Sequence, residues 1–175
     1  MKIKTNSDKK KVESILEIIK LREDACLLLN SKTFATILTE SYYEIIKELS
    51  SALILLDGFK VIGTNAHKEL IDTLKDYSFS EMEISLLQDL RLKRNKSSYE
   101  GKQVDGSFLE FNEKNFKQII KPIKKIAIKL ITLKPSTCHG STFKCAMFKN
   151  LEISFESFSE TFNLIKFPKL WHHFS

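Results

Sequence analysis

Apolar residues recur at intervals of three and four positions through most of the first 133 residues, which predicts a series of amphipathic helices. We expect five of them, over residues 8–28, 33–56, 65–77, from Ser80 to just before Ser97, and 112–133. The second stretch has the longest apolar stripe, formed by Leu38, Tyr42, Ile45, Ile46, Leu49, Ala52 and Leu56. This pattern predicts an all-α fold, an up-and-down bundle of about five helices.

Residues that begin or end helices support these boundaries. Ser80-Glu81-Met82-Glu83 has the form of a capping box, in which a serine hydroxyl and a glutamate carboxylate satisfy free backbone amides at a helix start. Gly58 follows the second stretch, and Thr64 precedes the third as its expected cap. The polar residues 97–107 predict a loop, and Pro122 predicts a kink in the last helix.

The composition changes at Pro135, and the helical periodicity ends there. Residues 135–175 are rich in Phe and Ser, with a loose alternation over residues 150–162. A strand, an irregular segment packed on the core and a poorly ordered extension all fit this composition. We therefore divide the chain into a helical bundle over residues 1–134 and a C-terminal extension over residues 135–175.

Composition is typical of a globular protein that contains long helices. Apolar residues make up 42% and charged residues 29% of the 175 residues, and only 5 Gly and 3 Pro interrupt the chain. The polar, basic start has no apolar signal-peptide core, and no apolar run is long enough to cross a membrane. From these two features we expect a soluble, cytoplasmic protein. Three irregularly spaced cysteines do not have the pattern of a disulfide framework, which fits a reducing compartment.

The fourth helix carries an arginine where its apolar stripe should continue. Arg94 lies seven residues after Leu87 and four after Leu90, so its guanidinium should point inward and needs a partner. That partner is a carboxylate such as Glu40 or Glu44, a phosphate, or a second subunit. Alternatively, Arg94 belongs to a basic helix end that complements the helix dipole.

The segment from Arg94 to Gly101 resembles the "RN-x-x-x-[H/Y]" signature of the HEPN superfamily. Two further segments fit the same resemblance: residues 42–59 are similar to the long second helix of that family, with its "LL-x-x-G-[YF]" end, and residues 65–71 resemble its "x-H-x-x-L-I" helix. The resemblance extends over about residues 10–134. It implies a HEPN-like helical bundle that is usually a homodimer.

The resemblance also implies an activity, because many HEPN proteins are metal-independent, toxin-like endoribonucleases. In those members the arginine and a histidine four to six residues later form a composite site at the dimer interface, and a minimal nucleotidyltransferase is often the partner protein. On this basis Arg94, Asn95 and Tyr99 are the candidate catalytic residues. No cofactor is implied.

The sequence departs from the family pattern at the expected histidine, where it has Tyr99. A phenol has a pKa of about 10 and is a poor general base at neutral pH, although it can donate a hydrogen bond or stack on a base. Two interpretations therefore remain open: an endoribonuclease with a degenerate motif, and a non-catalytic module that binds a nucleotide, RNA or a protein. A third is a structural scaffold in which Arg94 pairs with Glu40 or Glu44.

The net charge of +6 and the pI of about 9.1 suit an anionic partner such as a nucleic acid. The candidate phosphate contacts are Arg91, Lys93, Lys96, Lys121 and Lys125, for which a solvated helix face is the alternative. His67 is an accessory candidate, or a hydrogen-bonded structural residue on the inner face of its helix. No metal site is expected, because the spacing of Cys138, His139, Cys145, His172 and His173 matches no common zinc pattern.

Overall fold

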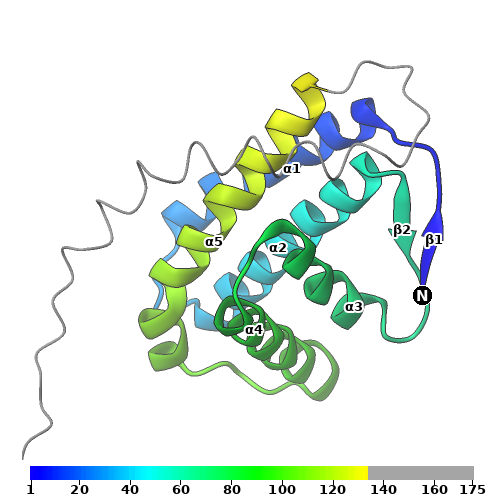
Figure 1. The fold of residues 1–175 in the computed structure, drawn as a ribbon. Helices are drawn as coiled ribbons and strands as arrows, with labels where there is room; N and C mark the ends of the chain where they lie inside the picture. Colours follow the sequence, from blue (N-terminus) through cyan, green and yellow to red (C-terminus); the bar gives the residue numbers. More distant parts are fainter. Residues whose placement is uncertain (134–175) are drawn as a thin grey trace, which may run out of the picture. The chain divides into compact units, whose positions relative to one another are not determined.

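The structure, a computed structural model, describes residues 1–133, and the expected extension over residues 135–175 lies outside this part of the chain. The described elements are, in order, β1 (Lys2–Lys4), α1 (Lys9–Leu28), α2 (Ala35–Leu56), β2 (Phe59–Val61), α3 (Ala66–Asp72), a 3-10 helix η1 (Thr73–Tyr77), α4 (Glu81–Glu100) and α5 (Gly106–Leu133) (Figure 1). The expected all-α bundle is confirmed.

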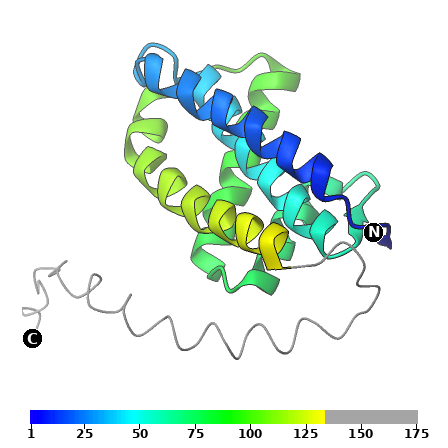
Figure 2. The same ribbon diagram turned by 90° about the horizontal axis from the view of Figure 1, so that it is seen from above.

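Helix α2 lies at the centre of the bundle and packs against α1, α3, α4 and α5. Figures 1 and 2 show α1, α2 and α5 alongside one another, with α4 crossing α2. All seven residues of the apolar stripe predicted for α2 are buried. Because α2 meets the other helices on nearly all sides, its few polar side chains lie against those helices, and they form most of the site described below.

The start of α4 agrees with the capping-box prediction, and its end does not agree with the predicted loop. The Ser80 hydroxyl accepts from the Glu83 amide at 3.3 Å, and the Glu83 carboxylate accepts from the Ser80 amide at 2.8 Å. The helix continues through the expected loop region to Glu100 and ends at Gly101, whose φ of +66° favours glycine. Contacts of Ser97 and Ser98 with α2 hold this last polar turn in helical form.

Two other boundaries differ from the prediction. Helix α5 begins at Gly106 and not at residue 112, because Leu109 is buried in the core and extends the inward apolar stripe by one turn. The expected Thr64 cap is wrong: Asn65 is the N-cap residue of α3, and it makes no side-chain capping hydrogen bond. The predicted third helix over residues 65–77 is two elements, since its last turn tightens into the 3-10 helix η1.

A short antiparallel pair of strands, β1 and β2, was not predicted by the sequence pattern. Ile3 pairs with Lys60, and the Thr5 amide donates to the Gly58 carbonyl at 2.8 Å. Gly58 has a φ of +78°, and a Cβ placed there would lie 3.2 Å from the Thr5 carbonyl oxygen. Glycine at this position therefore lets the chain leave α2 and approach β1 closely.

The longest helix, α5, shows how the helices divide into inner and outer faces. Phe116, Ile120 and Ile123 are buried, Lys121 and Lys125 are exposed, and Pro122 lies inside the helix at its surface. Every long helix described carries charged side chains in this way. Among residues 1–133, no helix combines the length and the apolar character that crossing a bilayer requires.

Candidate functional site

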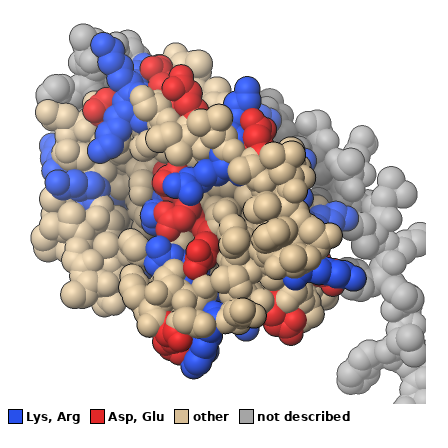
Figure 3. Space-filling view, turned by 180° about the vertical axis from the view of Figure 1, so that it is seen from behind, with Lys and Arg blue, Asp and Glu red and all other residues tan. Residues whose placement is uncertain are grey.

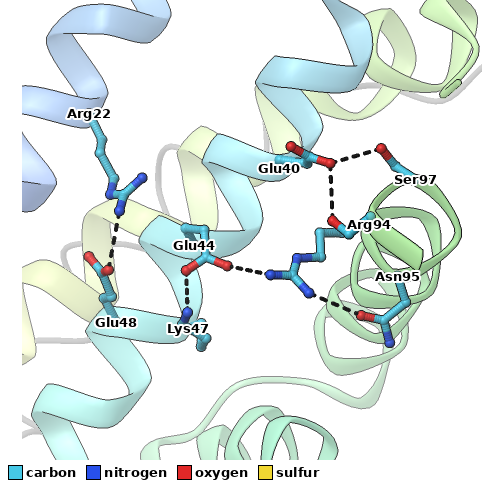
Figure 4. Close-up of polar contacts among 9 residues, drawn as sticks. Arg22, Glu40, Glu44, Lys47, Glu48, Arg94, Asn95 and Ser97 are labelled. Atoms are coloured by element: carbon cyan, nitrogen blue, oxygen red, sulfur yellow. Dashed lines mark hydrogen bonds and ion pairs between the residues drawn. The ribbon is translucent and has the colours of Figure 1, made fainter. Parts of the chain in front are cut away.

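Arg94 lies on α4 with its side chain directed at α2, and only 18% of that side chain is exposed. One guanidinium nitrogen, Nη2, donates to Oε1 of Glu44 at 3.1 Å (Figure 4). Of the partners that the sequence left open for this inward arginine, the structure shows a carboxylate of α2, and Glu44 is the residue that makes the ion pair. The charge-assisted bond fixes the planar fork in one orientation.

Two tyrosine rings flank the same guanidinium. Its Cζ atom lies 5.1 Å from the ring centre of Tyr43 and 5.9 Å from that of Tyr99. Tyr43 is 1% exposed and belongs to the core, whereas Tyr99 is 76% exposed at the last turn of α4. Both distances are within the range of cation–π attraction. Arg94 therefore lies near one buried and one exposed aromatic ring.

The carboxylates of Glu40, Glu44 and Glu48 lie four residues apart along α2 and form a ladder. Glu40 accepts from the Ser97 hydroxyl at 2.8 Å and from the Ser98 hydroxyl at 3.2 Å, and Glu48 pairs with Arg22 of α1 at 3.5 Å. Figure 4 shows the three carboxylates following one another along α2, with Glu44 between Lys47 and Arg94. Each carboxylate has its own cation or donor, so the ladder links α2 to α1 and α4.

The central carboxylate of this ladder stays ionised. Burial raises the pKa of Glu44, and the hydrogen bond and charge of Lys47 together with the charge of Arg94 more than offset this, leaving its pKa below the usual value. At neutral pH Glu44 is therefore negative and holds two cations, one on α2 and one on α4.

His67 is not on the inner face of its helix, as its structural interpretation required. The side chain is exposed, and its ring centre lies 6.1 Å from that of Tyr43, the ring that also contacts Arg94. Partial burial and the nearby charges of Lys47 and Arg94 lower the pKa of His67. The structure thus places a mainly neutral imidazole in the neighbourhood of Arg94.

Asn95 and Arg91 lie at the sides of this group. The Asn95 Oδ1 accepts from Arg94 Nη1 at 3.5 Å, which is a weak contact. Arg91 Nε donates to Gln88 Oε1 at 2.7 Å, and the Gln88 amide donates to Asp72 at 2.8 Å. Arg91 is therefore tied toward α3, on the side of α4 where His67 lies.

The five predicted phosphate contacts do not form one patch. Lys93 lies over the ring of Phe108 at 5.1 Å, at the start of α5, and Lys96 is exposed on α4. Lys121 lies 13 residues further along α5, about 20 Å from Phe108 at 1.5 Å per residue, and Lys125 is farther still. On the face drawn in Figure 3, basic and acidic side chains are intermixed.

Sequence reasoning found Arg94, Asn95, Tyr99 and His67 but missed the contribution of Tyr43 and Lys47. Tyr43 lies in an apolar helix, where an aromatic residue predicts burial in the core and gives no indication of a functional contact. The spacing of Glu40, Glu44 and Glu48 was the available signal, because three carboxylates on one face of a largely buried helix require cations nearby. Within residues 1–133, no group of His, Cys, Asp and Glu side chains is arranged to hold a metal ion.

Together these side chains form a fixed cation, a neutral imidazole and an exposed aromatic ring at one end of α4. This combination suits a ligand that has a negatively charged group beside a planar one, such as a nucleotide unit. The Tyr43 hydroxyl is buried and has no hydrogen-bond partner among the described residues. In comparisons with protein-family models, curated proteins and solved structures, the chain matches none of them.

Proposed function

We propose that this chain is an RNA-acting protein of HEPN type, which binds RNA at Arg94 and cleaves it without a metal ion. The observation that carries the proposal is the Arg94 guanidinium, fixed by Glu44 and placed between the rings of Tyr43 and Tyr99. The resemblance of residues 94–101 to the HEPN signature gives this arrangement its chemical meaning. Asn95 and Tyr99 complete the proposed catalytic group.

The proposed role of Arg94 is to stabilise the negative charge that develops on an RNA phosphodiester during cleavage. When a ribose 2′-hydroxyl attacks phosphorus, negative charge grows on the phosphate oxygens, and a cation held in place lowers the energy of that transition state. Arg94 stays charged at any working pH, and its Nη2 atom is held by Glu44. The exposed ring of Tyr99 offers a surface on which an unpaired base stacks.

The same proposal covers the assembly and location of the protein. We propose a cytoplasmic homodimer, with Arg94 and Tyr99 near its two-fold axis, and a minimal nucleotidyltransferase as its partner protein. The support is the HEPN resemblance. A sedimentation measurement on the purified full chain that gives a single monomeric species at working concentration would contradict the dimer.

The test of function is cleavage of labelled single-stranded RNA in EDTA by the full chain, compared with Arg94→Ala. We expect cleavage by the wild type and its loss in Arg94→Ala. Arg22→Ala is the matched control, since it removes another arginine that pairs with an α2 carboxylate, Glu48, away from Tyr99. Equal cleavage by wild type and Arg94→Ala would contradict the proposal.

A second candidate function is a non-catalytic module that binds RNA, a nucleotide or a protein. Tyr99 favours it, because the position where the family signature places its histidine has a phenol. In that case RNA binds with an affinity that Arg94→Ala weakens, and no product forms. If Arg94→Ala only lowers thermal stability and leaves RNA binding unchanged, Arg94 serves the α2–α4 contact alone.

A further inference from the structure

We propose that His67 is the general base of the reaction, the group that the motif around Arg94 does not itself supply. This inference rests on the proposed function and names a catalytic residue from a different helix. His67 comes from α3, 27 positions before Arg94 in the chain, and the fold brings both to the ring of Tyr43.

The geometry places the imidazole and the guanidinium against one aromatic residue. The ring centre of His67 is 6.1 Å from that of Tyr43, and the Arg94 Cζ atom is 5.1 Å from the same centre. His67 is exposed while Tyr43 is buried, so the imidazole lies on the solvent side of the ring and is open to a substrate. A base and a cation that both lie near one ring can act on a single phosphodiester.

The groups that face His67 keep it unprotonated. On α2 these are Lys47 and Glu44, and on α4 they are Arg91 and Arg94. Partial burial has the largest effect in lowering the pKa of His67, and the three cations add to it and outweigh the single carboxylate. At neutral pH the imidazole is therefore ready to accept a proton.

The proposed step conserves atoms and charge. A ring nitrogen of His67 accepts the proton of a ribose 2′-hydroxyl while the 2′-oxygen forms a bond to phosphorus. The bond from phosphorus to the 5′-oxygen of the next nucleotide breaks, and that oxygen takes a proton from water. The products are a 2′,3′-cyclic phosphate and a 5′-hydroxyl, and His67 returns its proton to solvent. Arg94 neutralises the charge on the phosphate oxygens throughout.

Tyr99 cannot readily take this role from its place in the motif. To act as a base, a phenol must first lose its own proton, and phenols as a class lose it only well above neutral pH. An imidazole with a lowered pKa is mostly in its basic form under the same conditions. Of these two side chains near Arg94, His67 is thus the one whose chemistry fits proton removal.

The experiment compares single-turnover cleavage of labelled RNA in EDTA by the wild-type full chain, His67→Asn, Tyr99→Phe and Lys68→Ala between pH 5 and pH 8. We expect His67→Asn to cleave about 10²-fold more slowly or worse at pH 7, with RNA binding retained. The wild-type rate should rise with pH through the lowered pKa of His67 and then level off, and the residual rate of His67→Asn should lack that rise. Lys68→Ala, a change at an exposed neighbour on α3, is the control for the helix itself.

The outcomes separate this inference from the proposed function. Wild-type cleavage that is lost in Arg94→Ala but unchanged in His67→Asn overturns the role of His67 and leaves the proposed function standing. Loss in Tyr99→Phe with full activity in His67→Asn overturns it in favour of the phenol. Absence of cleavage by the wild type overturns the cleavage function and the base together. Circular dichroism of each variant shows whether its fold is retained.

Discussion

At the scale of single residues, the site depends on how Arg94 is neutralised. The sequence predicted that Arg94 points inward and needs a partner, because Leu87, Leu90 and Arg94 share one face of a helix. It did not decide between Glu40 and Glu44, since the two carboxylates lie one turn apart on the same face of α2 and only the packing of α4 distinguishes them. The structure assigns Glu44 to the guanidinium and Glu40 to two serine hydroxyls.

The Glu44 carboxylate, bound by Lys47 and Arg94, should stabilise the fold in a pH-dependent way. Since the pKa of Glu44 is lowered in the folded protein, its stabilising effect is present above the ordinary pKa of about 4.3 and is lost as the pH falls through the lowered value. We expect Glu44→Gln to reduce the free energy of unfolding by about 1–2 kcal/mol at pH 7. Urea unfolding from pH 7 to pH 2.5 checks this, with Glu17→Gln on an exposed face of α1 as the control. A difference that persists in full at the acid end would refute it.

The charges around His67 give a second residue-level prediction. Lys47 is the cation with the largest effect on His67, so Lys47→Ala should raise the pKa of His67 toward the ordinary value of about 6.5. Titration of the histidine ring protons by NMR measures this directly. Lys75→Ala removes a cation that is not among the groups facing His67 and should leave the titration unchanged. Identical curves for wild type and Lys47→Ala would show that the two groups do not interact.

At the scale of elements, the position of Tyr99 depends on where α4 ends. The polar run over residues 97–107 suggested a loop, yet the helix continues to Glu100, because Ser97 and Ser98 contribute hydroxyls to Glu40. Local polarity could not predict this, since the stabilising partner lies 57 residues away in the chain. The strands β1 and β2 escaped prediction for a similar reason: each has only three residues, too few for a recognisable alternation.

Gly101 should be the residue that fixes this helix end. Its φ of +66° is unfavourable for residues with a Cβ, while no atom would obstruct that Cβ within 4 Å, so the effect of Gly101→Ala is conformational. We expect it to lower the free energy of unfolding by about 1 kcal/mol. Gly106→Ala is the matched control: Gly106 is the first residue of α5, and an added Cβ there makes an ordinary 3.5 Å contact. Thermal unfolding should show a clear decrease for the first variant and little change for the second.

At the scale of the whole molecule, the positive charge is spread over several surfaces. The sequence predicted the helical bundle, because amphipathic periodicity is a local property. It could not predict which lysines accompany Arg94, since that depends on how α4 and α5 are placed around α2. The structure leaves Lys96 on the same helix as Arg94 and sets Lys121 well along α5.

RNA binding should report this distribution of charge. Lys96→Ala should weaken binding and reduce the slope of log affinity against log salt by about 0.7, the value for one phosphate contact with a single strand. Lys121→Ala and Lys125→Ala should change neither quantity, because both lie far from the Arg94 end of α4. Fluorescence anisotropy with a labelled single-stranded RNA between 50 and 300 mM salt measures it. An equal loss of affinity in all three variants would instead indicate a binding surface that extends along α5.

The position of Glu44 between Lys47 and Arg94 has a consequence for any anionic ligand. A phosphate that approaches the guanidinium competes with a carboxylate already bound there, so the two anions exchange places. Lys47 remains on the displaced carboxylate and keeps it neutralised, which makes the exchange less costly. While the ligand is bound, the ion pair between α2 and α4 is lost. Binding at the site is therefore coupled to the stability of the contact between these two helices.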